Sequence, residues 1–271
     1  MTDRVARKLG VAITTFNSER SIGRLLESVK SIATTIAVVD SGSTDKTIEI
    51  CLEFGIEPVH RQFDNHKENK GASNRLAESS GWLLMMDSDE SIDEELAASI
   101  RSAVARDDPR HEGYFVVRKL FMQGQWLHHF GYPDRVLRLV RRGKWRMDGP
   151  SPHEALVVDG ETADLAGTCL HESYRDLADA RARTSRYADI SSRTMFAQGR
   201  SGGTIIDLLV RPMAAFVKHG ILQRGLLDGS LGWHLSLLTA TGTWEKHSRL
   251  RRLRAAARTE RPERPERPAR T

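Results

Sequence analysis

Two carboxylates follow a strongly apolar segment in residues 82–91, WLLMMDSDES. Asp87 and Asp89 are separated by one serine, so a turn at this point can bring both side chains inward. Two close carboxylates repel each other unless a cation compensates them. Hard divalent cations such as Mg²⁺ and Mn²⁺ suit carboxylate oxygens and keep positions open for substrate phosphates. The pair therefore indicates a metal-assisted site, and the alternative is a solvated acidic turn that Glu90 extends.

Two further polar groupings follow apolar, β-branched segments. Residues 14–17 (TTFN) close the run that begins at Leu9, and residues 40–45 (DSGSTD) follow IAVV. Either grouping alone is explained by a strand-to-helix turn or by N-cap chemistry. In an open α/β sheet, however, ligands bind outside the carboxyl ends of the strands. Three such groupings on one sheet edge therefore predict a binding site.

The order of the elements predicts how that edge is built. Strands are expected at residues 9–15, 36–40, 56–60 and 82–86, with helices between them and at residues 91–104. Ser91 and Glu94 form a capping box for the last of these helices. Strand and helix thus alternate as far as residue 105, which favours an α/β fold with a doubly wound, Rossmann-like sheet.

The pattern changes after residue 105. Segments 113–121, 135–142 and 154–171 read as strands that extend the sheet into a mixed one, with Asp159-Gly160 as a hairpin turn. Helices with a break at Gly199–Gly203 follow. The expected division is an α/β domain at 1–175, a helical C-terminal region at 176–248 and a basic, disordered tail with a PER repeat at 249–271.

Composition sets the broad class of the protein. The chain has 271 residues, 39% hydrophobic and 28% charged, which suits one large domain with appendages. The net charge of +5 favours anionic partners, although much of it lies in the C-terminal arginines. Cys51 and Cys169 lack metal-type spacing and are expected to be reduced thiols. With no signal peptide and no transmembrane run recognised, a cytoplasmic location is expected.

A family resemblance rests on three segments in a fixed order: ITTFN, VVDSGSTDKT and LLMMDSDES. They resemble the nucleotide-sugar-binding half of a family-2 inverting glycosyltransferase with the GT-A fold, over roughly residues 9–175. Later segments (131–145, 151–158 and 170–177) are similar to bacterial lipopolysaccharide core β-1,4-glucosyltransferases. The resemblance implies transfer of glucose or another hexose from a nucleotide sugar, expected to be UDP-linked. The implied acceptor is a surface glycan or lipid-linked molecule of the cell envelope.

The same resemblance assigns roles to the three groupings. Asp40 would hydrogen-bond the nucleobase, Asp87 would lie beside the ribose and diphosphate, and Asp89 would ligate a bridging Mn²⁺ or Mg²⁺. The expected nucleotide-sugar contacts are Thr14, Thr15, Asn17, Asp40, Ser41, Gly42, Lys70, Asn74, Asp87 and Ser88. His171 follows an apolar strand and is the second expected metal ligand, with a purely structural histidine as the alternative.

Inverting transfer also requires a general base for the acceptor hydroxyl. The family usually places it in a Glu-Asp pair, which this chain lacks in the expected region. Glu154 is the first candidate, and an exposed charge at a strand edge is the alternative for it. Asp134 is the second, with an ion pair to Arg135 or Arg138 as the alternative. A basic strand is expected nearby, facing either the diphosphate or solvent: Arg135, Arg138, Arg141 and Arg142.

Residues 204–244 mix many leucines and aromatic residues with scattered charges. Such a segment lies on a membrane better than it spans one, so peripheral contact with the inner face of the plasma membrane is expected. The alternatives are a helical subdomain that packs on the sheet and a dimer interface, and the oligomeric state is left open.

Two other functions remain for the chain as a whole. A haloacid-dehalogenase-like phosphohydrolase also places Asp-x-Asp after an apolar strand, but normally on the first strand of its domain, and here three strands precede the pair. A non-enzymatic, basic nucleic-acid-binding module would suit the sequence pI of about 9.4. It would leave the carboxylates at the strand ends unexplained, because they repel phosphate, so no nucleic-acid partner is expected.

Overall fold

The computed structural model describes residues 8–62, 66–77, 80–131, 134–149 and 155–259. These residues form two compact units. The first comprises residues 8–126 and 134–173, and the second comprises residues 127–131 and 174–259. The division after Ser173 lies close to the boundary expected at residue 175. Residues 127–131, however, belong to the second unit although they lie within the α/β part of the sequence.

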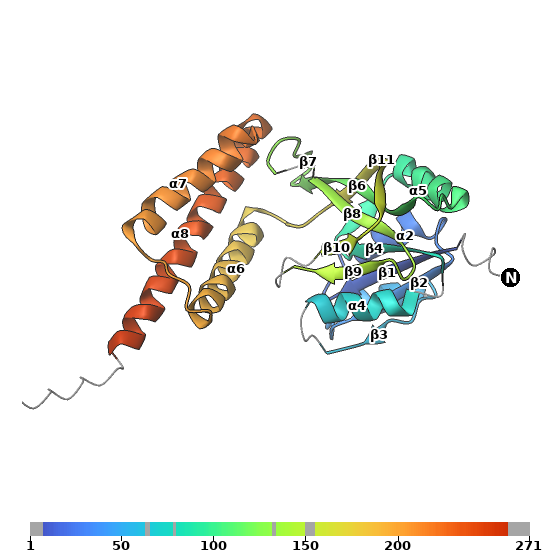
Figure 1. The fold of residues 1–271 in the computed structure, drawn as a ribbon, viewed down its shortest axis with the longest axis horizontal. Helices are drawn as coiled ribbons and strands as arrows, with labels where there is room; N and C mark the ends of the chain where they lie inside the picture. Colours follow the sequence, from blue (N-terminus) through green and yellow to red (C-terminus); the bar gives the residue numbers. More distant parts are fainter. Residues whose placement is uncertain (1–7, 63–65, 78–79, 132–133, 150–154, 260–271) are drawn as a thin grey trace, which may run out of the picture. The chain divides into compact units, whose positions relative to one another are not determined.

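Four parallel strands form one half of the main sheet in the first unit (Figure 1). Their order is β3-β2-β1-β4, with β1 at Leu9–Thr15, β2 at Thr35–Asp40, β3 at Val59–His60 and β4 at Trp82–Asp87. The predicted α/β fold with a doubly wound sheet is therefore confirmed. Because β1 is central among these strands, the polar segments that follow β2 and β4 lie on either side of the segment that follows β1.

The other half of the sheet is mixed, in the order β8-β6-β11-β5 after β4. It is built from β8 (Asp134–Arg141), β6 (His111–Met122), β11 (Glu161–His171) and β5 (Glu90–Ile92), with β7 (Gln125–Trp126) beside β6. The predicted hairpin at Asp159-Gly160 is wrong. β10 (Ala155–Val158) pairs with β9 (Trp145–Asp148) in a separate ribbon, whereas β11 runs parallel to β6. The turn therefore carries the chain from one sheet to the other.

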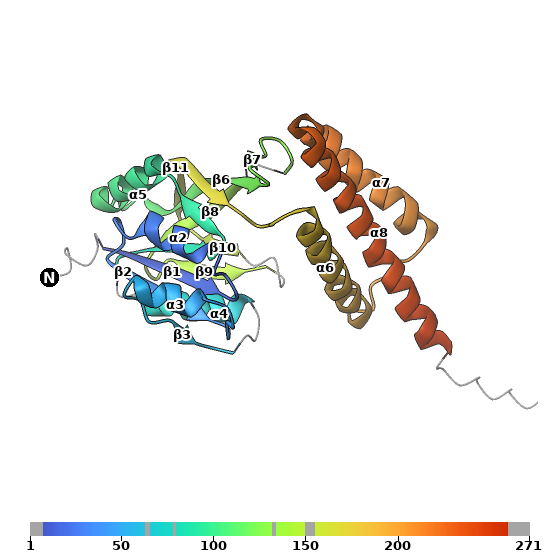
Figure 2. The same cartoon turned by 180° about the vertical axis from the view of Figure 1, so that it is seen from behind.

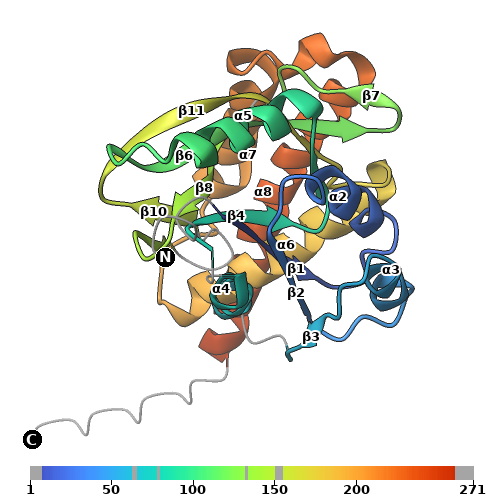
Figure 3. The same cartoon turned by 90° about the vertical axis from the view of Figure 1, so that its right-hand side faces the viewer.

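Alternate side chains of the central strands pack into two cores, as the pleat of a strand requires. Val11 and Leu84 face the core that α2 (Ile22–Val29), α3 (Thr47–Glu53) and α5 (Glu94–Arg106) cover, whereas Ala12 and Met85 face the core beneath α4 (His66–Ala77). α4 lies in front of the strands in Figure 1 and α3 in front of them in Figure 2. Figure 3 shows the two helices on either side of β1 and β2.

Two local features decide where the helices begin and how close they lie. The expected capping box is wrong, because Ser91 pairs with Leu170 inside the sheet. Asp93 caps α5 instead, accepting a hydrogen bond of 2.8 Å from the Leu96 amide. On the other face of the sheet, a side chain at Gly10 would place its Cβ 2.2 Å from the Ala77 carbonyl oxygen. Glycine at that position lets α4 lie directly on β1.

The second unit is helical. α6 (Leu177–Ala197) and α8 (Gly229–Thr259) pack along each other, and η1 (Ile206–Val210), α7 (Arg211–Phe216), η2 (Val217–Leu222) and η3 (Gly225–Asp228) join them. The prediction of a disordered tail from residue 249 is wrong for residues 249–259, because α8 continues through them. Arg249 donates to the Ser185 carbonyl and hydroxyl, and Leu250 is buried. Within the described residues, no helix has the length and apolarity that a bilayer crossing requires.

Candidate active site

The three predicted polar groupings lie together at the carboxyl ends of neighbouring strands. In the sheet register, Thr15 of β1 lies opposite Asp40 of β2, and Thr14 lies opposite Asp87 of β4. Three segments that are far apart in the sequence thus meet at one edge. This is the edge at which α/β sheets bind ligands.

Side-chain hydrogen bonds join the three segments. The Asn17 amide donates to Ser43 Oγ at 2.8 Å, and Asn17 Oδ1 accepts from the Thr44 amide at 2.9 Å. Asn17 has a φ of 48°, a left-handed conformation that asparagine tolerates better than most residues. On the other side of β1, Ser18 Oγ and Ser88 Oγ lie 2.8 Å apart. Hydrogen bonds therefore connect the segments that follow β1, β2 and β4 into one surface at this edge.

Asp40 shapes the turn that follows β2. Its carboxylate accepts from the amides of Gly42 (2.8 Å) and Ser43 (2.9 Å) and from the Ser43 hydroxyl, and the residue is almost fully buried. Gly42 has a φ of +94°, in the region that favours glycine. Asp40 thus fixes the half-buried backbone of the turn, and the nucleobase contact expected of it stays a prediction.

Two cations hold the carboxylate of Asp87. Lys70 Nζ of α4 lies 2.5 Å from its Oδ1, and an Arg138 guanidinium nitrogen of β8 lies 2.7 Å from its Oδ2. Burial alone would raise the pKa of Asp87, but the charges of Lys70 and Arg138 outweigh it and hold this pKa well below 3.8. Asp87 therefore stays ionised, and side chains supply charge compensation that the sequence analysis assigned to a metal.

The depressed pKa of Asp87 predicts a specific acid sensitivity. The stabilising contribution of this carboxylate is present above pH 3.8 and is lost as the pH falls towards its folded-state pKa. In Asp87→Asn, the free energy of unfolding should fall less steeply below pH 4, by up to about 1.4 kcal/mol per pH unit. Urea unfolding between pH 7 and pH 3 measures both slopes. The control is Asp164→Asn, which removes a carboxylate of β11 that is 61% exposed.

Glu90 has a different role from the one expected. One expectation for Glu90 is a solvated acidic turn, but it lies in β5 with its side chain fully buried. It forms ion pairs with Arg138 and Arg118, and the second oxygen of its carboxylate accepts from the Asp87 amide at 3.0 Å. Arg118 also binds Asp134, at 2.6 Å. Glu90 thus joins the Asp87 turn to the mixed half of the sheet.

This network changes two expectations for the basic strand. The partner of Asp134 is Arg118, not Arg135 or Arg138. Arg138 does face the site, but its contacts there are the carboxylates of Asp87 and Glu90. Arg135 pairs with Asp164, and Arg141 pairs with Asp107 beyond the opposite end of β4. A glutamate in a short buried strand, with arginines on later strands, is the signal that could have indicated the network.

Asp89 and His171, the two expected metal ligands, lie side by side. Asp89 Oδ1 is 3.4 Å from His171 Nε2, and both side chains are partly exposed. Register pairing of Glu90 with His171 holds the two segments together, and the Glu172 amide donates to the Asp89 carbonyl at 2.9 Å. A carboxylate and an imidazole suit Mn²⁺, and both suit a site that diphosphate oxygens complete. The donor set therefore fits the metal that the family resemblance implies. No cluster of three or more acidic, histidine or cysteine ligands occurs in the described part of the chain.

The remaining predicted residues differ in accessibility. Thr14, Ser41 and Ser88 are half-buried at the edge, whereas Thr15 is buried. Asn74 is fully buried, and its amide nitrogen lies 3.8 Å from Met85 Sδ, so the structure does not favour direct contact with a nucleotide. Glu154, the first candidate for the base, lies outside the described residues.

Sequence reasoning missed Asn69, which precedes Lys70 on α4. Its amide nitrogen donates to Ser41 Oγ at 2.9 Å, and its Oδ1 is buried without a hydrogen-bond partner. The hydroxyl of Thr15 is likewise buried and unpaired. Buried polar atoms usually have partners. Asn69 therefore joins the candidate site, and its spacing from Ser73 on the inner face of α4 could have indicated it.

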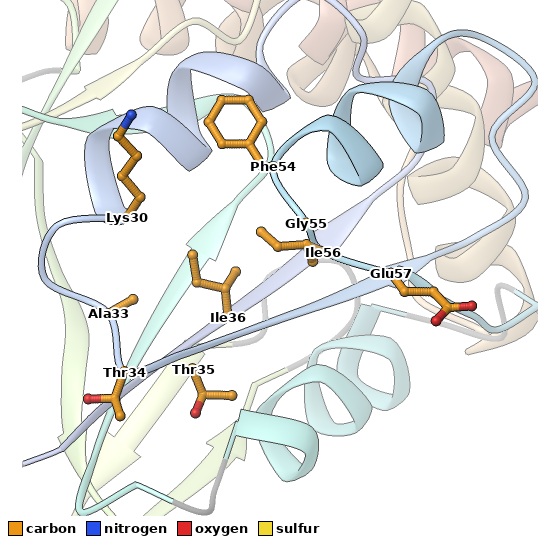
Figure 4. Close-up of a pocket in the computed structure, with 9 residues that line it drawn as sticks. All are labelled: Lys30, Ala33, Thr34, Thr35, Ile36, Phe54, Gly55, Ile56 and Glu57. Carbon is orange, nitrogen blue, oxygen red and sulfur yellow. The ribbon is translucent and has the colours of Figure 1, made fainter.

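One pocket of about 440 Å³ lies away from these carboxylates (Figure 4). Its lining includes Lys30 at the end of α2, Thr35 at the start of β2, and Phe54 after α3. It therefore lies at the amino end of β2, opposite the end that carries Asp40. The chemistry described above does not belong to this pocket.

An open α/β sheet with charged and hydroxyl side chains gathered beyond its parallel strands defines a ligand-binding α/β protein. The family is given by a direct match: residues 10–169 match the model described as glycosyl transferase family 2. The match covers more than half of the chain, so the protein belongs to this family of enzymes. Its mixed sheet is the GT-A-type fold that the resemblance implied, and the phosphohydrolase and nucleic-acid-binding alternatives are set aside.

Relatives match nearly the full length of the chain. The lipopolysaccharide core biosynthesis glycosyltransferase LpsC of Rhizobium meliloti is 26% identical over 260 residues, 89% of this chain and 93% of that protein. An uncharacterized glycosyltransferase of Rickettsia conorii is 28% identical over 262 residues, 93% of this chain and 92% of that protein. The match therefore includes the helical unit as well as the α/β unit.

Solved structures resemble the chain more remotely. Glucosyl-3-phosphoglycerate synthase of Mycobacterium tuberculosis, in complex with Mg²⁺ and uridine diphosphate, has a TM-score of 0.45 and 14% identity, covering 74% of this chain and 82% of that one. TarS of S. aureus has a TM-score of 0.40 and 15% identity, covering 95% and 93%. Similarity at this level adds nothing to the family assignment.

Proposed function

We propose that the protein transfers a hexose from a nucleotide sugar, with inversion at the anomeric carbon and with the help of a divalent cation. The observation that carries this proposal is the 3.4 Å approach of Asp89 to His171, beside the Lys70–Asp87 ion pair and beyond three parallel strands. One edge thus offers a metal-type pair and fixed polar groups together. A nucleoside diphosphate suits such an edge, because it carries a base, a ribose and two phosphates in a row.

The residues at this edge divide the binding of the donor among them. The turn shaped by Asp40 would receive the nucleobase, and Asp87, fixed by Lys70 and Arg138, would accept hydrogen bonds from ribose hydroxyls. Asp89 and His171 would hold Mn²⁺ or Mg²⁺, which as a Lewis acid stabilises the charge on the leaving diphosphate. Since both cations beside Asp87 are already engaged, its charge is balanced before the donor binds.

The acceptor hydroxyl must lose a proton as it attacks the sugar. Asp134 is a candidate base because its side chain is one-third exposed, at the amino end of β8, and Arg118 keeps the carboxylate oriented at 2.6 Å. Glu154 is the other candidate. A positioned base typically contributes about 10²–10⁴-fold to the rate. The true base is therefore the one whose amide variant loses turnover of that size while still binding the nucleotide.

A uridine-linked donor and a lipopolysaccharide-core acceptor are the narrower proposal. Support for the acceptor comes from the similarity, along 89% of this chain, to LpsC, a glycosyltransferase of lipopolysaccharide core biosynthesis. The acceptor would then be a sugar hydroxyl on a lipid-linked oligosaccharide. Peripheral attachment of the enzyme to the cytoplasmic face of the membrane would bring it to such an acceptor.

The decisive experiment is a donor screen. We expect the purified full-length chain, with Mn²⁺ or Mg²⁺, to release nucleoside diphosphate from one or two nucleotide sugars in a panel, and a chelator to abolish the release. UDP-hexoses should lead the panel. Metal-independent turnover, or release of inorganic phosphate from simple phosphomonoesters, would contradict the proposed chemistry.

A further inference from the structure

In the segment from residue 204 to residue 227 of the helical unit, large apolar side chains are exposed and a carboxylate is buried. Six apolar side chains, each at least 62% exposed, form what we call the apolar face: Ile205, Ile206, Leu209, Met213, Leu222 and Leu227. Asp207, within the same segment, is only 5% exposed. A helix on the surface of a water-soluble core normally has the opposite arrangement, with apolar residues inward. The apolar face is thus built to meet an apolar environment.

Both carboxylates of this region are engaged inside the unit. Asp207 accepts from the amide and the hydroxyl of Thr204, at 3.0 Å and 2.8 Å. Asp228 accepts from three consecutive backbone amides, those of His128, His129 and Phe130, at 2.7–3.0 Å. Both carboxylates are buried as a result, so they add little negative charge to the surface of this region.

The cations of the same region are exposed. Lys218 and Arg224 both lie at the surface, and Arg211 is 61% exposed although it also reaches Asp207. The surface charge of the segment is therefore positive. Apolar side chains interspersed with cations are the composition of helices that lie at the surface of a bilayer.

Helix α8 extends the apolar face. The rings of Phe216 and Trp233 meet edge to face with their centroids 5.3 Å apart, so α7 contacts α8 beside the exposed side chains. Leu237 and Trp244 follow Trp233 at intervals of four and seven residues, and all three are 45–48% exposed. Tryptophan has an apolar ring with one polar N–H, which suits the boundary between lipid and water.

We propose that the apolar face and its cations bind the surface of an anionic lipid bilayer. Large exposed apolar patches are rare on monomeric proteins unless they contact a partner. A second copy of the chain is the less favoured occupant, because a two-fold contact would bring Lys218 and Arg224 towards the same cations of the other copy. The headgroups of an anionic bilayer complement both the charge and the apolarity. This proposal rests on the helical unit alone and does not depend on the transfer reaction.

Vesicle binding by the full-length protein tests the proposal. We expect co-sedimentation with vesicles of phosphatidylcholine and phosphatidylglycerol, weak binding to phosphatidylcholine alone, and weaker binding in high salt. The double variant Lys218→Gln/Arg224→Gln should bind about 25-fold more weakly, since each charge near the surface contributes about fivefold. Leu209→Asn/Met213→Asn should lose about tenfold or more. All four side chains are exposed, so these variants should fold, which circular dichroism verifies.

Matched controls separate this surface from general stickiness and from self-association. Leu52→Asn changes a leucine of similar exposure (55%) on α3 and should bind vesicles as the wild type does. Equal binding to neutral and anionic vesicles, or unchanged binding by both double variants, would overturn the proposal. So would a dimer in lipid-free buffer that Leu209→Asn/Met213→Asn converts to monomer in sedimentation velocity. Donor turnover measured without lipid should be unchanged in every variant, so a failure here is distinct from a failure of the proposed reaction.

Discussion

Replacing Asp89 with alanine should reduce donor turnover by about 10²–10³-fold, the usual effect of removing one group that stabilises charge at a reacting centre. The reason is positional. Asp89 Oδ1 lies 3.4 Å from His171 Nε2, and removal of the carboxylate leaves an imidazole as the remaining ligand of this pair. Turnover should also lose its dependence on Mn²⁺. Steady-state release of nucleoside diphosphate, measured across a range of Mn²⁺ concentrations, gives both quantities.

Two comparisons make the Asp89 result specific. Asp164→Ala removes a carboxylate from the same sheet, near the start of β11, seven residues before His171, and should keep wild-type turnover. His171→Gln should weaken the response to Mn²⁺ without affecting binding of the nucleoside alone. If Asp89→Ala kept full turnover with unchanged metal dependence, the metal assignment and the proposed reaction would both be wrong.

The sequence was sufficient for the strand ends because the signal there is local. A short apolar run predicts a buried strand, and the polar residues that follow it must lie at its carboxyl end. Asp40 and Asp87 end their runs in this way, and the parallel register then brings both beside Thr14 and Thr15. The position of these side chains at one edge of the sheet could therefore be predicted without knowing their contacts.

The contacts of the same side chains could not be predicted, because they depend on strands that are distant in the sequence. Arg138 reaches Glu90 across 48 positions and Asp87 across 51. These partners depend on the pairing of β8 with β4, and no local sequence pattern predicts which strand pairs with β4. The Asp-Gly hairpin failed for the same reason: Asp159-Gly160 has the right turn chemistry, but β10 found its partner in β9 and β11 in β6.

Arg138→Leu should lower the free energy of unfolding by about 3–5 kcal/mol, the usual cost of removing one partner from a buried ion pair. Arg138 has a side-chain exposure of 6% and contacts two carboxylates, one of which, Glu90, is fully buried. Asp87 is still 25% exposed and keeps Lys70, whereas Glu90 is fully buried and, among the described residues, would keep only its ion pair with Arg118. Lysine should not restore the loss, because one ammonium group cannot reproduce the planar fork of donors. Urea unfolding at pH 7 measures the change.

The control for Arg138→Leu lies three residues away on the same strand. Arg135→Leu breaks an ion pair between Arg135 and Asp164, both at least half exposed, and should change the free energy of unfolding by no more than about 1 kcal/mol. In the double variant Arg138→Leu/Glu90→Leu, the second substitution should cost less than Glu90→Leu does alone, since neither charge is then left buried by itself. Equal losses for Arg135→Leu and Arg138→Leu would mean that the network beneath Asp87 contributes no more to stability than a surface ion pair.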